Sequence, residues 1–276
     1  MKKILLFFAF LICLKLGFAQ RKKPRFKVIA FFTAKHDPAH ISFVNEANEM
    51  FQRTAKSHHF DYDTTTNWRN LNAAFLSSYQ AVIFLDTRPE KPEQRVAFQT
   101  YMESGGSWMG FHFAGFALEK SSYDMDWDWY HNQFLGSGSF LSNTWKPTSA
   151  VLRVEKPKHP TMKDLPAKFR SQPNEWYRWK NDLRENANID ILLSIDPLSF
   201  PLGTGPKQAE IWNSGYYPVV WTNKKYRMIY INMGHNDMDY EHKIDASNKT
   251  ISYTFDNVFQ NRLVLNSLLW LVGCCK

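Results

Sequence analysis

The chain has 276 residues, of which 44% are hydrophobic and 16% aromatic, and its formal net charge is +8 at pH 7. Lys and Arg within residues 1–25, a stretch without Asp or Glu, supply seven of these eight charges, so residues 26–276 carry only +1. A nucleic-acid-binding protein needs a basic face on its folded body. The charge distribution therefore argues against nucleic acid as a partner.

The N-terminus has the pattern of a secretory signal. Two lysines precede an apolar run that ends in small residues, which predicts cleavage after Ala19. We therefore expect a signal peptide over residues 1–19, a basic leader over 20–25 and a single domain over 26–276. The apolar run is too short to give the mature protein a stable membrane span. These features predict a periplasmic or secreted protein.

Apolar runs in the first half of the chain predict alternating strands and helices. The helix expected within 91–106 begins with Pro92 and ends at Gly105-Gly106, residues typical of a helix start and stop. An earlier helix is expected over 41–57, and strands are expected over 27–33, 60–66, 80–86 and 107–112. This β-α-β-β-α-β order predicts an α/β fold with a mostly parallel sheet and helices on both faces.

The second half of the chain differs in composition and shows less clear periodicity. Residues 120–185 are rich in Trp, Tyr, Asp and Pro and predict a long decorated insertion. It is expected to hold a helix near 126–135 and a strand near 149–155. Further strands are expected over 189–195, 217–222 and 226–234, followed by a closing helix over 255–273.

The segment "GSWMGFHFAG" places His112 at a sharp turn from a strand into a helix. Small residues allow such a turn and leave one side chain at its apex, near free backbone N–H groups. An imidazole there can act as acid, base or metal ligand. The alternative is a packed histidine that bonds a carbonyl.

His235 ends the predicted strand over 226–234 in the same way, at "YINMGH". Because chemistry gathers at the carboxyl ends of parallel strands, the two histidines are candidates for one shared site. Glu175 lies among aromatic residues in "PNEWYRW", where desolvation is expected to raise its pKa. The alternative for Glu175 is an ordinary ion-paired or rim carboxylate.

Other polar and aromatic residues are candidate substrate contacts. The loop "AKHDPAH" contains His36, Asp37 and His40, and the first two are the candidate ligand contacts, although Asp37-Pro38 is equally typical of a turn and helix cap. Asp86 ends the strand over 80–86. Aromatic rings beside Asp and Asn are a common sugar-binding combination, and the candidates of this kind are Trp127, Trp129, Tyr130, Trp176 and Tyr177.

In chain order, the segments "GGSWMGFHFAG", "DWYHNQFLGSGSF", "KHPTMKDLP", "NEWYRW", "PVVW" and "MGH" resemble the ThuA-like (trehalose utilisation) family. The resemblance covers about residues 26–273 and implies a flavodoxin-like three-layer α/β/α fold similar to class I glutamine amidotransferases. In those enzymes the residue at the apex of this strand-to-helix turn, called the elbow, is a cysteine. The ThuA-like pattern has a histidine at the elbow, here His112. His235 matches the histidine of the family's "GH" motif, and Glu175 matches the acidic residue of its "E-x-Y"-like segment. The His159-Pro160 pair matches the family's "HP" motif and is interpreted as a structural turn.

The resemblance implies a role in di- or oligosaccharide utilisation, with a small carbohydrate as ligand. His112, His235 and Glu175 would be the catalytic residues, acting by proton transfer on a glycoside or keto-sugar or with a divalent metal. Glutamine hydrolysis is not expected, because imidazole does not replace a thiolate. A non-catalytic carbohydrate-binding protein is the alternative, and it predicts histidines that are apart or sealed by packing. The sequence leaves the cofactor and the oligomeric state open.

Overall fold

The structure, a computed structural model, describes residues 24–35, 37–119, 126–144, 146–199, 215–236 and 252–274. The expected signal peptide, most of the leader and His36 lie outside these residues. No helix in the described part of the chain is long and apolar enough to cross a membrane.

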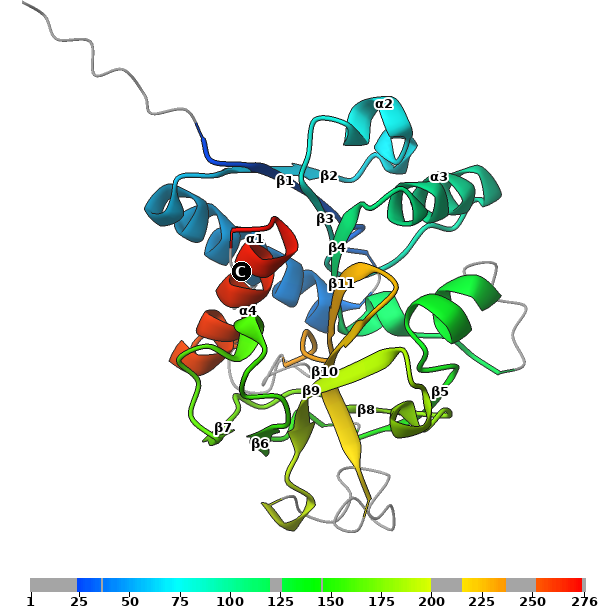
Figure 1. The fold of residues 1–276 in the computed structure, drawn as a ribbon. Coiled ribbons are helices and arrows are strands. Elements are labelled where there is room, and N and C mark those ends of the chain that lie inside the picture. Colours follow the sequence, from blue (N-terminus) through cyan, green and yellow to red (C-terminus); the bar gives the residue numbers. More distant parts are fainter. Residues whose placement is uncertain are drawn as a thin grey trace, which may run out of the picture.

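Nine strands of the described chain form one sheet, in the order β2-β1-β3-β4-β11-β10-β9-β6-β7 (Figure 1). Neighbouring strands from β2 to β11 are parallel, and those from β11 to β7 are antiparallel. The strands are β1 (Lys27–Phe31), β2 (Asp61–Thr65), β3 (Ala81–Phe84), β4 (Ser107–Phe111), β6 (Val151–Val154), β7 (Lys168–Arg170), β9 (Ile189–Ile195), β10 (Tyr217–Asn223) and β11 (Arg227–Ile231).

Helices cover both faces of this sheet (Figure 1). On one face, α1 (Pro38–His58) and α4 (Val258–Leu271) pack against the strands. On the other face lie α2 (Ala73–Leu76) and α3 (Pro92–Glu103). The predicted three-layer α/β architecture is confirmed.

The alternation of side chains along β1 explains the two cores. Val28 and Ala30 face the α1 side, whereas Ile29 and Phe31 face the α3 side, and all four are buried. A strand that is buried on both faces reads as a continuous apolar run, and "KVIAFF" is such a run.

Two features differ from a simple parallel sheet. The second half of the sheet, β10-β9-β6-β7, is antiparallel, and a three-residue connection over 224–226 joins β10 directly to β11. The aromatic insertion forms a π-helical turn over Trp129–Phe134 and a small sheet of β5 (Phe140–Asn143) with β8 (Tyr177–Trp179). Side-chain packing rather than helical periodicity organises this segment.

We predict that Phe98→Ala lowers the free energy of unfolding by about 3–5 kcal/mol, since it empties a fully buried ring site. Phe98 is 0% exposed on α3 and contacts the rings of Phe84, Trp108 and Phe134. Val96→Ala on the same helix is the control, because Val96 is 66% exposed and its loss costs within about 0.5 kcal/mol. Urea denaturation measures both, and equal losses would contradict the predicted core.

Candidate functional site

His112 lies at the apex of the expected strand-to-helix turn. β4 ends at Phe111, and residues His112–Gly115 form one 3₁₀ turn, with His112 at a φ of 38°. The Tyr230 hydroxyl donates to the His112 carbonyl over 2.6 Å and holds this conformation. A Cβ on Gly115 would lie 2.6 Å from the Tyr230 ring, so the close approach requires glycine. Backbone strain of this kind is common at functional sites, and here it fixes the direction of the His112 side chain.

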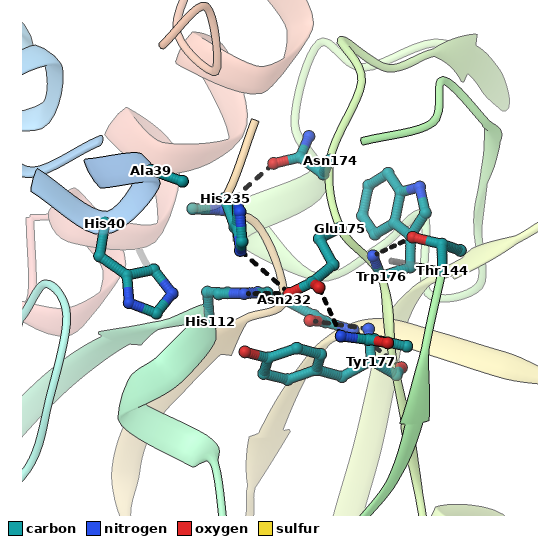
Figure 2. Close-up of polar contacts among 12 residues, drawn as sticks. Ala39, His40, His112, Thr144, Asn174, Glu175, Trp176, Tyr177, Asn232 and His235 are labelled. Atoms are coloured by element: carbon teal, nitrogen blue, oxygen red, sulfur yellow. Dashed lines mark hydrogen bonds and ion pairs between the residues drawn. The ribbon is translucent and has the colours of Figure 1, made fainter. Parts of the chain in front are cut away.

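Glu175 joins the two predicted histidines. Its Oε2 atom lies 3.0 Å from His235 Nδ1 and 3.4 Å from His112 Nε2 (Figure 2). The ring centroids of the histidines are 5.7 Å apart and the rings are nearly perpendicular. Residues separated by more than a hundred positions thus meet at the carboxyl edge of the sheet, as the strand-end argument predicted.

Amide side chains fix this carboxylate and its neighbours. Asn143 Nδ2 donates to Glu175 Oε1, and the Glu175 backbone N–H donates to the His235 carbonyl over 2.7 Å. Asn174 Oδ1 accepts from Gly234 N over 3.1 Å, and Asn232 bonds the backbone of Tyr177. These hydrogen bonds fix the orientation of Glu175 and of the backbone around it, so the site is organised before a ligand binds.

The prediction that desolvation raises the pKa of Glu175 is wrong in its net sign. Burial does act to raise the pKa, since Glu175 is only 5% exposed. However, the interactions with His112 and His235 outweigh burial and hold the pKa below its usual range. Glu175 is therefore a charged carboxylate between two imidazoles.

His40 completes the cluster, and sequence reasoning did not place it there. It lies in the first turn of α1, with its ring 5.2 Å from that of His235 and 5.7 Å from that of His112. Burial, with the neighbouring His235 and His112, lowers the pKa of His40 to about 3. The only sequence signal was its position just after β1, at the same edge of the sheet.

The three histidines fit a metal ion. One nitrogen from each of His40, His112 and His235 lies within 4.8 Å of the others, the only such group found among the described residues. His40 Nε2 is buried and has no hydrogen-bond partner in the described chain. Neutral imidazoles are suitable ligands for zinc and similar ions, and Glu175 supplies the carboxylate that commonly orients a liganding histidine.

Asp37 and Asp86 have mainly structural contacts. Asp37 caps α1, because its side chain accepts from Ala39 N over 2.9 Å, and this confirms the helix-cap alternative. Asp86 is 4% exposed and accepts from Thr33 N over 2.8 Å and from the Ala34 N–H over 2.6 Å. Asp86 therefore holds the loop after β1 rather than presenting its carboxylate to a ligand.

The predicted aromatic contacts divide into three groups. Trp129 is 8% exposed, and Tyr130 and Trp176 are fully buried, so these three are packing residues. Tyr177 belongs to the histidine site, with its ring centroid 4.0 Å from that of His112. Trp127 lines a separate cavity of about 370 Å³ together with Asp126 and other polar residues.

Comparison with known proteins agrees with this architecture. The model of the ThuA, or trehalose utilisation, family matches residues 27–246. The chain belongs to the ThuA-like family. This membership supports a role for the ThuA-like chain in sugar utilisation. No protein of curated function matches the sequence closely enough to lend it an activity.

Solved structures place the ThuA-like chain in the same family. A putative ThuA-like protein from Bacteroides uniformis is 35% identical, with a TM-score of 0.79 over 92% of this chain and 94% of that one. A putative ThuA-like protein from Parabacteroides merdae has 19% identity and a TM-score of 0.58 over 91% of each chain. The second match shows a shared fold.

We predict that Glu175→Ala destabilises the ThuA-like chain by about 3 kcal/mol, because it leaves buried amide and imidazole groups without their carboxylate. Glu119→Ala is the control, since Glu119 pairs with Lys180 and its side chain is 61% exposed. Exposed pairs of that kind contribute at most about 1 kcal/mol. Chemical denaturation monitored by tryptophan fluorescence measures both, and equal costs would contradict a buried ion cluster.

Proposed function

We propose that this protein is an exported enzyme that performs either acid/base chemistry or metal-assisted chemistry on a keto-sugar or glycoside. The observation that carries the proposal is the convergence of His40, His112 and His235 with the Glu175 carboxylate at one sheet edge. Membership of a sugar-utilisation family supports the substrate class. The signal pattern over residues 1–19 supports export to the periplasm or beyond.

The residues suit chemistry on a carbonyl-bearing sugar. A carbonyl acidifies the neighbouring C–H bond, and a neutral imidazole can accept that proton. Burial lowers the pKa of His112 and favours its neutral, basic form. The charged Glu175 carboxylate stabilises an imidazolium once the proton has moved. Isomerisation, epimerisation and elimination of a glycosidic group all begin with this proton transfer.

Three side chains at the site keep part of their surface exposed to solvent. The His235 side chain is 13% exposed, that of His40 is 12% exposed and that of Asp37 is 32% exposed. A divalent ion bound by the histidines would supply a Lewis acid that polarises the carbonyl oxygen. In that case the three histidines would hold the ion and would not themselves accept the substrate proton. The Tyr177 ring lies beside that of His112, with the two planes tilted by 31°, and covers one side of the imidazole.

Glutamine amidotransfer does not fit these residues. That chemistry needs a thiolate at the elbow, and the elbow residue is His112. Cys274 is exposed just after α4. The end of α4 lies beside the start of β4, since Ser107 Oγ donates to the Leu271 carbonyl, whereas the elbow follows the end of β4. Imidazole at the apex favours acid, base or metal chemistry instead.

The alternative of a non-catalytic carbohydrate-binding protein predicted histidines that are apart or sealed by packing. The imidazoles lie together, which argues against the first of these expectations. The His112 ring is 1% exposed and is covered by Tyr177, whereas His235 keeps 13% of its side chain exposed. A charged carboxylate between two imidazoles suits proton transfer or metal ligation better than the binding of a neutral sugar. We therefore favour the enzyme.

We predict that His112→Ala and His235→Ala each lower turnover of 3-keto-disaccharides by about 10²–10⁴-fold, the usual contribution of a positioned acid or base. His40→Ala is expected to reduce bound divalent metal, measured by elemental analysis, and to lower turnover with it. The measurement is a kinetic screen of oxidised and unmodified disaccharides, with and without a chelator.

His58→Ala is the matched control, since His58 lies in the last turn of α1 while His40 lies in the first. That variant should keep both the metal and the full rate. Binding of the sugars without turnover in the metal-loaded wild type would favour the carbohydrate-binding alternative. Turnover unchanged in both His112→Ala and His235→Ala would reject the assigned roles.

A further inference from the structure

The sheet has a topological switch point that the histidine site does not occupy. From β1 the chain passes through α1 to β2 on one side, then returns across β1 to reach β3 on the other. Helices α1 and α2 cover opposite faces, so the connections on the two sides of β1 diverge. In open α/β sheets, ligands bind in the crevice that such a divergence leaves at the carboxyl ends of the strands.

A cavity of about 340 Å³ lies at this point. Its lining comes from the segments that follow all three strands, including Lys35 after β1, Trp68 and Arg69 after β2, and Arg88 and Lys91 after β3. The volume is at the lower end of the range for small-molecule sites. The cavity is thus the size of a site for a compact metabolite.

The lining of this cavity is strongly cationic. Lys35, Arg69, Arg88 and Lys91 line it, against the single carboxylate of Glu90. The Arg88 guanidinium is fully buried and pairs with Asp126 over 2.9 Å. Within the described chain, the side chains of Lys35, Arg69 and Lys91 have no carboxylate partner. Uncompensated positive charges around a concave surface concentrate anions there.

One lining residue also carries a hydrogen-bond donor without a partner among the described residues. Trp68 Nε1 is buried and has no acceptor among the described residues, while its ring packs on those of Phe31 and Phe84. A buried donor without an acceptor is costly, and a ligand oxygen would satisfy it. The first turn of the 12-residue helix α3, from Pro92, borders the cavity through Lys91 and Gln94. Its positive dipole end adds to the attraction for an anion.

We infer that this crevice binds the oxyanion of a small molecule: a phosphate, sulfate or carboxylate group. Arg69, Lys91 and Lys35 contact the anion from three different loops, and Trp68 Nε1 donates to one of its oxygens. The site is separate from the histidine cluster and does not depend on the proposed reaction. It is nevertheless adjacent, since Arg88 Nη1 donates to the Phe113 carbonyl and the Phe113 ring lies 4.9 Å from that of His40.

Isothermal titration calorimetry of the full chain at low ionic strength tests this site by measuring the Kd of small anions. The probes are inorganic phosphate, sulfate, glucose 6-phosphate and glucuronate, with glucose as the neutral probe. Phosphate-bearing and carboxylate-bearing probes distinguish the two kinds of anion. We expect binding of at least one anionic probe, no binding of glucose to this crevice, and a Kd that rises with salt concentration.

Substitutions separate this crevice from general surface charge. Arg69→Gln and Lys91→Gln, both at exposed positions, should each raise the Kd about tenfold, as expected for loss of a charge-assisted contact. Trp68→Phe keeps the ring packing and should also weaken binding. Lys158→Gln and Lys225→Gln, exposed lysines elsewhere, should change the Kd less than twofold. The inference is overturned if no anion binds, or if all these variants behave alike.

Discussion

The carboxylate of Glu175 is the interaction on which the candidate site depends. It contacts the imidazoles of His112 and His235, accepts from Asn143, and remains charged although it is almost fully buried. A buried charge is tolerated only when paired and hydrogen-bonded groups replace its water. The carboxylate therefore ties β8, the turn after β4 and the loop after β11 to one another.

The fold delivers these groups to a single edge because its strands are parallel there. Parallel strands end on the same side, so the residues that follow β1, β4 and β11 are neighbours without being close in sequence. The insertion contributes Tyr177, the first residue of β8, and Glu175, which lies two residues before that strand. The aromatic residues of the insertion mostly form the packed support for that element.

Two groups of side chains with different chemistry share this edge. The histidine cluster offers neutral imidazoles and one carboxylate, which suits proton transfer and metal ligation. The crevice between β1 and β3 offers cations and a buried donor, which suits an anion. Arg88 and Phe113 connect them, because Arg88 donates to the Phe113 carbonyl and the Phe113 ring lies 4.9 Å from that of His40.

The sequence by itself determined the α/β class, most strands and helices, and the elbow at His112, because these follow from local periodicity and turn chemistry. It also indicated that His112, His235 and Glu175 belong together. Only the tertiary structure decided that His40 joins them and that Glu175 stays charged. It also decided that the Asp86 carboxylate accepts hydrogen bonds from the loop after β1. Those outcomes depend on which distant groups surround a side chain, and burial and neighbouring charges do not follow from local sequence.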